Sequence, residues 1–361
     1  MTTQPASAPP DWLYLVAQAT QAPSGHNSQP WLFKLNPDSI EVHPDLRRSL
    51  PAVDPEHREL YVSLGCAVEN LCLAATEKGY ASQVTVADSG IITVALTHNP
   101  GISPDPLAAQ IGLRQSNRRV YSGRLLSEHT VAQLAAAAQG EGVRLHLYPR
   151  DTPAFEAIAE FVYRGNTVQM HDEAFKTELK SWMRFNRKHQ DSTLDGLSYA
   201  VFGAPNLPAF LSRPIMTMQI NAATQNKNDS QRIQSASHLA LFTTASDSLR
   251  ERVALGRSLQ RFWLTATALG VACAHLNQPN EVPRLAREMA ASLQLGAERP
   301  TVLLRLGYAD KLPYSKRRPV SEVLMWCLKS KHQIIELAAR ATDARMVSAL
   351  LRHTKGLGSW L

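Results

Sequence analysis

The chain has 361 residues, 44% of them hydrophobic, with 18 Gly and 22 Pro, a composition that suits a globular protein and excludes a fibrous or disordered one. No apolar run is long enough to cross a membrane and no signal peptide is recognisable, so we expect a soluble, cytoplasmic protein. The net charge of +7 is typical of some nucleic-acid-binding proteins, but six Lys or Arg against two acidic residues within 326–361 supply much of it. Because the excess is concentrated in that tail, we expect no nucleic-acid partner.

The first part of the chain alternates helical and strand patterns behind a leader at 1–10 that we expect to be disordered. Each helix begins at a capping residue and ends near Pro or Gly. The expected elements, in chain order, are a helix from Asp11 to Pro23, strands at 30–35 and 40–43, a helix from Asp54-Pro55 to Gly79 and a strand at 91–96.

The second part contains similar elements, interrupted by a long insertion at about 160–215. The expected elements are a helix from Ser127 to about Ala138, a strand at 143–148, a helix over 248–270 and a strand at 301–307. The insertion combines a charged helix with a loop rich in Gly and Pro. Long segments of this kind often cover a binding site, so we expect a lid.

The two long helices resemble each other in sequence. Residues 65–82 and 256–273 align without gaps and match at six of eighteen positions, among them Gly65 with Gly256 and Gly79 with Gly270. Each helix is followed by an apolar strand and then by an arginine cluster. A duplication giving a fused pseudo-dimer explains this order better than chance. The expected domains are a first half at 11–110, a second half at 111–324 and a basic amphipathic helix at 325–361.

The four cysteines give no reason to expect a metal centre. Cys66, Cys72, Cys273 and Cys327 form no CxxC pair, and no group of histidines has metal-ligand spacing. Cys66 and Cys72 fall within helical patterns, where we expect buried free thiols. Such thiols agree with a reducing, cytoplasmic compartment.

Three short stretches carry groups suited to a small anionic or planar ligand. The turn at 22–31, APSGHNSQPW, is rich in backbone donors and small polar side chains, although an ordinary capped connection would look similar. The stretch at 114–119, RQSNRR, has guanidinium groups that bind phosphate well, and KRRP at 316–319 has the same character. Either basic stretch alone is equally consistent with a solvated loop.

Together the three stretches resemble the nitroreductase superfamily, and specifically its fused, Acg-like subgroup. APSGHNSQPW is similar to the family's APSxxNxQPW segment, RQSNRR to its RxSxR phosphate-binding stretch, and KRRP to its C-terminal basic element. The resemblance covers about residues 11–324. It implies an α+β fold of the three-layer α/β/α nitroreductase type, an FMN cofactor, and NAD(P)H as reductant.

The resemblance also implies where FMN is bound. Pro23, Ser24, Gly25 and Asn27 are expected beside the flavin ring. Arg114, Gln115, Ser116 and Arg118 are expected at the phosphate and ribityl chain, with Lys316, Arg317 or Arg318 beside them and His275 and Leu276 near the ring's N5 edge. The second half carries no APSxxNxQPW segment, and no RxSxR stretch precedes the first helix. We therefore expect one FMN site and one degenerate site.

The expected activity is ping-pong hydride transfer from NAD(P)H through FMN to a nitroaromatic, a quinone or another small acceptor. No side chain is required as a catalytic acid or base, although His26 and His275 are candidates. Two alternatives stay open: a flavin-sequestering protein whose lid blocks turnover, and a flavin oxidase, dehalogenase or flavin-cleaving enzyme. The C-terminal helix is expected to pack on the body or to form a homodimer.

Overall fold

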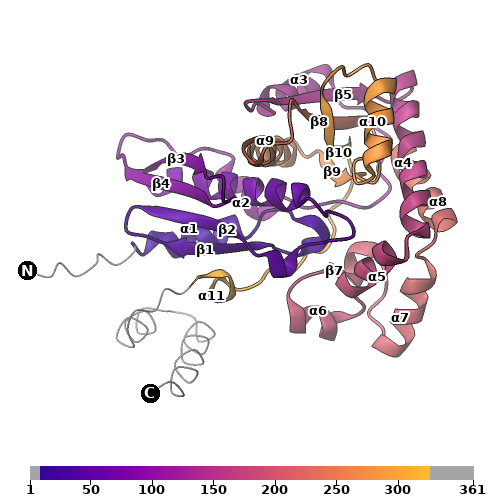
Figure 1. Ribbon diagram of the computed structural model, residues 1–361, viewed down its shortest axis with the longest axis horizontal. Helices are drawn as coiled ribbons and strands as arrows, with labels where there is room; N and C mark the ends of the chain where they lie inside the picture. The colour runs from indigo at the N-terminus through magenta and orange to yellow at the C-terminus, as the bar shows by residue number, and fades with distance from the viewer. Residues whose placement is uncertain (1–8, 326–361) are drawn as a thin grey trace, which may run out of the picture.

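The computed structural model describes residues 9–325 and contains two four-stranded antiparallel sheets (Figure 1). The first has the order β1-β2-β4-β3 and is built from β1 (Trp31–Leu35), β2 (Ser39–Pro44), β3 (Tyr80–Val86) and β4 (Ile92–His98). The second has the order β5-β8-β10-β9 and is built from β5 (Val143–Pro149), β8 (His238–Thr244), β9 (Ala272–His275) and β10 (Arg299–Gly307). With helices packed on both sheets, the mixed α+β class expected from the sequence is confirmed.

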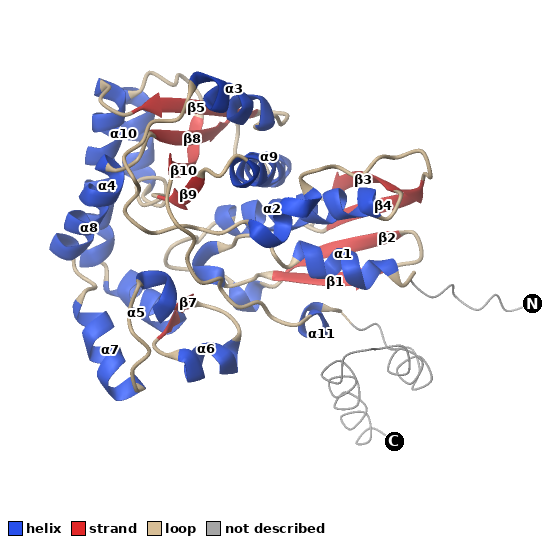
Figure 2. Cartoon of the chain, turned by 180° about the vertical axis from the view of Figure 1, so that it is seen from behind, coloured by secondary structure: helices blue, strands red, loops and turns tan. Residues whose placement is uncertain are grey.

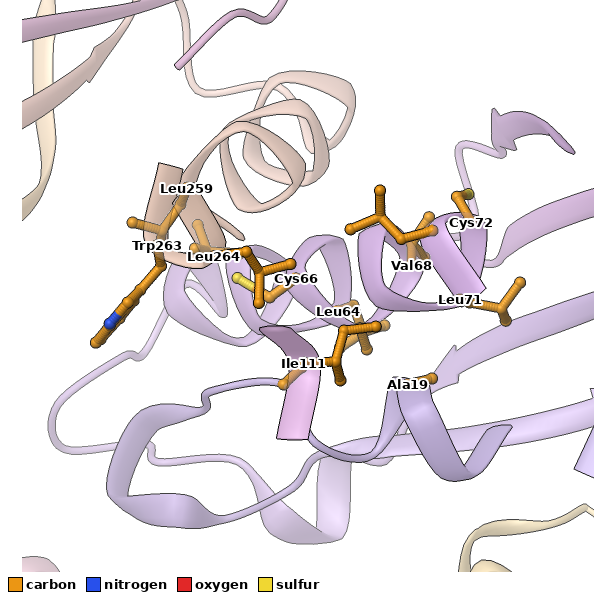
Figure 3. Packing of buried hydrophobic residues seen from close by; sticks show 14 of the residues in the cluster. Ala19, Leu64, Cys66, Val68, Leu71, Cys72, Ile111, Leu259, Trp263 and Leu264 are labelled. Atoms are coloured by element: carbon orange, nitrogen blue, oxygen red, sulfur yellow. The ribbon is translucent and has the colours of Figure 1, made fainter. Parts of the chain in front are cut away.

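Two helices of 20 residues, α2 (Arg58–Glu77) and α9 (Leu249–Ala268), pack against each other between the sheets (Figure 1). Side chains from both helices meet in one continuous core, where Cys66 of α2 lies near Leu264 of α9 (Figure 3). The Cys66 thiol donates to the carbonyl of Gly256 at 3.1 Å. Cys66, Cys72 and Cys273 are buried free thiols, as expected for the first two.

The two sheets follow the same chain path. Two strands, one long helix and two further strands occur in the order β1-β2-α2-β3-β4 in one and β5-β8-α9-β9-β10 in the other, with equivalent pairing. A short helix precedes each set, α1 (Asp11–Ala19) before β1 and α3 (Glu128–Ala137) before β5. Ser127 caps α3 as expected, because its hydroxyl accepts the N–H of Thr130.

The insertion between β5 and β8 is longer than the expected 160–215. It contains α4 (Pro153–His171), α5 (Glu173–Trp182), α6 (Arg187–Thr193), α7 (Ala209–Met218) and α8 (Ala222–Gln234), with a two-stranded parallel pair, β6 (Met183–Arg184) and β7 (Leu197–Ser198). Helices α4 and α8 lie beside the second sheet, whereas α5, α6 and α7 form a lobe of their own (Figure 2). Asp172 separates α4 from α5, since its carboxylate accepts the N–H groups of Ala174 and Phe175.

The chain returns to the first sheet after β10. Helix α10 (Pro283–Ser292) leads into β10, and residues 308–319 then cross to a short helix, α11 (Val320–Val323). Leu324 forms a bridge with Phe33, and the N–H of Met325 donates to the Phe33 carbonyl at 2.7 Å. The basic stretch at 316–319 therefore lies beside the first half, although it follows the last strand of the second.

One of the expected helix boundaries is changed by local backbone conformation. The helix expected from Asp54 begins at Arg58, after His57 in the left-handed region (φ 57°). Asp54 lies before the helix but still caps it, because its carboxylate accepts the N–H of Leu60 at 2.8 Å.

Within residues 9–325 no helix is long and apolar enough to cross a membrane, and no cluster of His, Cys, Asp or Glu there could hold a metal ion. The expected C-terminal helix at 325–361 and most of the leader lie outside the described residues.

Candidate functional site

The turn that joins α1 to β1 has an unusual backbone. His26, Asn27 and Gln29 have φ values of 48°, 54° and 53°, in the left-handed region that non-glycine residues seldom adopt. Each such residue costs about 1–3 kcal/mol and persists only where its surroundings hold it. Here the Ser24 hydroxyl accepts the N–H of Gln29 at 3.0 Å, and the Gln29 amide donates to the Leu194 carbonyl at 3.0 Å. Strain held in this way is typical of functional sites.

Gly25 in the same turn makes a close contact. A Cβ at this position would lie 2.9 Å from Cδ1 of Leu50, so any larger residue would force the turn or Leu50 to move. Its half-buried neighbour Pro23 lies in the segment that leads into this turn. The small residues of the sequence motif therefore allow the turn to lie against the segment before α2.

Two arginines from distant parts of the chain meet at this turn. Arg114 is 5% exposed and donates to the Gln21 carbonyl at 2.6 Å, whereas Arg317 donates to Oδ1 of Asn27 at 2.7 Å and to the Ala22 carbonyl at 3.3 Å. Within the described residues neither forms an ion pair with a carboxylate, and the Nε of each is buried without a partner.

The electrostatics of this pair are unfavourable in the ligand-free chain. Burial lowers the pKa of Arg114 to about 10, and burial together with the charge of Arg114 lowers the pKa of Arg317 to about 9. A buried cation without a counter-ion is costly, and two that repel each other cost more. Such a pair fits a site that binds an anion, since a phosphate would accept from both guanidinium groups.

A third arginine, Arg118, faces the same region as two histidines. Burial, together with the charge of Arg118, lowers the pKa of His26 to about 4. Burial together with the charges of Arg118 and Arg114 lowers the pKa of His275 to about 3. The His275 side chain is nonetheless exposed to solvent. The guanidinium of Arg118 lies 5.4 Å from the ring centroid of Phe202 in the insertion.

Trp263 of α9 links the arginine pair to His275. Its ring is 5.1 Å from the His275 ring, edge to face, and 5.3 Å from the guanidinium carbon of Arg114. The side chain is 1% exposed, so it is also part of the core. This second role is not predictable from the sequence, because an aromatic residue on a buried helix face is usually interpreted as a core residue.

The insertion contacts the turn directly. The N–H of Gly196 donates to the Asn27 carbonyl at 3.3 Å, and the Asn27 amide donates to the Gly196 carbonyl at 3.3 Å. Next to this contact, Asp195 binds both Arg184, at 2.7 Å, and Arg48 of the first half. The insertion therefore lies against the candidate site, as a lid would.

Comparisons with known proteins find relatives that are similar over most of this chain. No family model matches the chain. "Putative NAD(P)H nitroreductase Rv3131" of Mycobacterium tuberculosis is 29% identical over 329 residues, covering 85% of this chain and 89% of the relative. "Putative NAD(P)H nitroreductase acg" of the same organism is 22% identical over 321 residues, covering 85% and 93%. This chain has nitroreductase-like homologues.

Solved nitroreductases are only distantly similar to this chain. A nitroreductase-like family protein from Bacillus cereus is 17% identical and covers 63% of this chain and 97% of its own, with a TM-score of 0.38. The FMN-dependent nitroreductase NfnB from Mycobacterium smegmatis, solved with NADPH, is also 17% identical and covers 61% and 96%, with a TM-score of 0.39. Such values do not define the site, which is described from this chain's own contacts.

Some of the expected site residues hold neighbouring segments in place. The Gln115 side chain donates to the Leu312 carbonyl at 3.0 Å and accepts the Leu312 N–H at 2.6 Å. Ser116 forms a bridge with Cys273, which ties the arginine stretch to the edge of the second sheet. These two residues therefore fix the loops from which Arg114 and Arg317 project.

Three other expected residues point away from the arginine pair. Leu276 is buried in the core of the second half, and its N–H donates to the Leu303 carbonyl at 2.9 Å. Lys316 is exposed, with its Nζ 3.5 Å from Asp191. The Arg318 guanidinium donates to the Glu322 carbonyl at 2.7 Å. Of the three basic candidates at 316–318, Arg317 alone joins Arg114.

The lowered pKa of His26 predicts that the protein is sensitive to acid. Folded His26 stays neutral down to about pH 4, whereas in the unfolded chain it gains a proton near its ordinary value of 6.5. Its stabilising contribution is therefore present above pH 6.5 and is lost as the pH falls toward 4. We expect His26→Gln to reduce the loss of Tm over this range in the FMN-free protein. The exposed His129→Gln is the control and should follow the parent; equal acid sensitivity of both variants would contradict the assignment.

Proposed function

We propose that this chain binds one FMN at the Arg114–Arg317 pair and is an NAD(P)H-dependent oxidoreductase that reduces small acceptors such as nitroaromatics or quinones. The observation that carries the proposal is the arginine pair itself, which lies beside a strained turn with the Nε of each arginine buried and without a carboxylate partner among residues 9–325. The names of the mycobacterial relatives, NAD(P)H nitroreductases, support the choice of reductant.

The residues at the site fit FMN. Arg114 and Arg317 would hold the phosphate, and the turn from Pro23 to Asn27 would meet the ring from the first half. His275 would meet it from the second. Bound FMN supplies the hydride-accepting ring, and NAD(P)H and the acceptor would use the same face in turn. The protein's part is to bind and orient the cofactor and to keep Arg118 near the reacting region as a fixed positive charge.

We further propose that the two sheets are the halves of a duplicated unit, with one site retained. The shared strand order supports this, as does the contact of Gly65 with Gly256. The turn before β5, equivalent to the one before β1, reads Gly140-Glu141-Gly142 and has no counterpart of the segment from Pro23 to Asn27 that is proposed to meet the ring. Titration with FMN, followed by absorbance after gel filtration, should therefore saturate at one FMN per chain. Saturation at two would contradict a degenerate second site.

The lid contact supports a second candidate function, the sequestering of flavin with little turnover. Gly196 and Leu194 of the insertion bind the turn at Asn27 and Gln29, which would restrict access to a bound ring. Mixing the FMN-loaded protein with NADPH under anaerobic conditions separates the two functions. Bleaching of the flavin absorbance supports the reductase. Yellow protein that resists NADPH supports sequestration, and protein that takes up no FMN contradicts both.

A further inference from the structure

One arginine of the first half connects the strained turn to the lid, the name used here for the lobe of residues 173–218 (Figure 2). Arg48 lies in the turn after β2 and donates to the Ser28 carbonyl, next to Asn27. The same guanidinium donates to the carboxylate of Asp195 in the lid, a residue 7% exposed. It also lies 5.3 Å from the ring centroid of Trp182, at the end of α5. Arg48 therefore contacts both sides of the seam between the first half and the lid.

The Asp195 carboxylate is already held within the lid by another arginine. Arg184, 6% exposed, donates to Oδ1 of Asp195 through Nε at 3.0 Å and through Nη2 at 2.7 Å, which leaves Oδ2 for Arg48. Burial opposes ionisation, but hydrogen bonds from Arg184 and Arg48 hold the pKa of Asp195 below its ordinary value. The carboxylate is therefore charged at neutral pH, and it stays paired with Arg184 even when Arg48 moves away.

Three backbone N–H groups donate across the same seam. The carboxylate of Glu178 in α5 accepts the N–H of Ala52 at 3.0 Å and that of Val53 at 3.1 Å. In the other direction, the N–H of Gly196 donates to the Asn27 carbonyl at 3.3 Å. A hydrogen-bonded N–H exchanges with solvent when its bond opens, so these three seam N–H groups report on the opening of the lid.

The apolar contact across the seam is small. Leu50 and Val53 of the first half pack with Met170 and Phe175 of the insertion in a cluster separate from the main core. Beside this cluster, a cleft of about 910 Å³ lies between residues 47–52 and the lid. A segment with few buried apolar contacts opens at a lower cost in free energy than the core of a fold. The polar contacts of the seam therefore contribute much of what keeps the lid closed.

We propose that Arg48 and Asp195 form a latch that holds the lid closed over the strained turn, and that FMN enters and leaves when this latch opens. The inference rests on the proposed function, in which the turn meets the flavin ring. Left-handed residues such as His26, Asn27 and Gln29 persist only where their surroundings hold them. The lid holds two of these three, because Asn27 and Gln29 donate to its carbonyl groups. Opening of the lid therefore also loosens the turn.

The latch can be tested in the FMN-free protein with Arg48→Met. Methionine keeps an apolar contact with Trp182, and Asp195 keeps its two hydrogen bonds from Arg184. The variant loses the charge-assisted hydrogen bond that crosses the seam. Hydrogen exchange of the three seam N–H groups, followed by mass spectrometry, should therefore become about 10–100-fold faster than in the parent.

Two controls separate opening of the lid from its unfolding. The N–H of Ala204 donates to the Tyr199 carbonyl at 3.0 Å within the lid, and its exchange rate should not change. Arg47→Met is the matched variant, because Arg47 is exposed and binds Asp45 of its own segment at 2.7 Å and 3.0 Å. Its seam N–H groups should exchange as in the parent. Equal seam exchange in Arg47→Met and Arg48→Met overturns the latch, and so does faster exchange at Ala204, which would show that the lid unfolds.

Control of FMN exchange is tested by the flavin fluorescence that is lost on binding and returns on release. A gate slows FMN in both directions, whereas a lost contact speeds release alone. Arg48→Met should therefore bind and release FMN about 10–100-fold faster than the parent, with Arg47→Met at the parent's rates. Faster release with unchanged association overturns the gating, as do unchanged rates in both directions. Failure of the parent protein to bind FMN would instead refute the proposed function and leave the hydrogen-exchange result to decide the latch.

Discussion

The double variant Arg114→Met with Arg317→Met should bind FMN about 10²–10⁴-fold more weakly than the parent protein. Without FMN, it should be at least as stable as the parent. Each charge-assisted hydrogen bond to a phosphate is worth about 1.5–3 kcal/mol, and the variant removes both guanidinium groups. Methionine keeps most of the side-chain volume, and it removes two charges that repel each other, one on the buried Arg114 and one on the half-buried Arg317. Affinity is measured by quenching of flavin fluorescence, and stability by thermal unfolding without FMN.

Arg119 provides the control for this variant. It lies in the same RQSNRR stretch and carries the same charge, but its side chain is exposed. Arg119→Met should leave FMN affinity within about twofold of the parent, since an exposed charge at this distance is screened by salt. Equal FMN affinity in the double variant and the Arg119 variant would show that phosphate is not bound by the arginine pair.

The fold was predictable where local signals were strong. The helix expected over 248–270 is α9, and Ser127 caps α3, because amphipathic spacing and capping residues act within a few residues of sequence. Strand β3 was not anticipated, since it is half exposed and polar and gains its partner only through β4. The pairing of β5 with β8 could not be predicted either, because the whole insertion separates these two strands in the sequence.

The site shows the same division. Arg114 and the turn at Asn27 were identified because short motifs carry them. Which of Arg317 and Arg318 lies beside Arg114 could not be predicted from the sequence. Neighbouring residues of an extended segment project in different directions, and only the packing determines which of them meets Arg114.

Gly65→Ala should be among the most destabilising single substitutions in the chain. A Cβ at Gly65 would lie 2.3 Å from the carbonyl oxygen of Val253, and one at Gly256 would lie 2.1 Å from that of Val62. Overpacking usually costs about 1–3 kcal/mol, and here the obstacle is helix backbone that cannot rotate away. We therefore expect a loss of about 3 kcal/mol or more, seen as a Tm lower by about 5–10 °C.

The same substitution should also weaken FMN binding, although Gly65 is not among the proposed FMN contacts. Helix α9 carries Trp263, which contacts Arg114 and His275, so a shift of α9 against α2 would separate the groups proposed to hold the phosphate from those proposed to meet the ring. Gly112→Ala is the matched control, because nothing lies within 4 Å of a Cβ there and its backbone is not left-handed. It should leave Tm and FMN affinity unchanged. If Gly65→Ala behaved like Gly112→Ala, the close crossing of α2 and α9 would not hold the two halves in register, and the match of Gly65 with Gly256 in the sequence would lose its physical explanation.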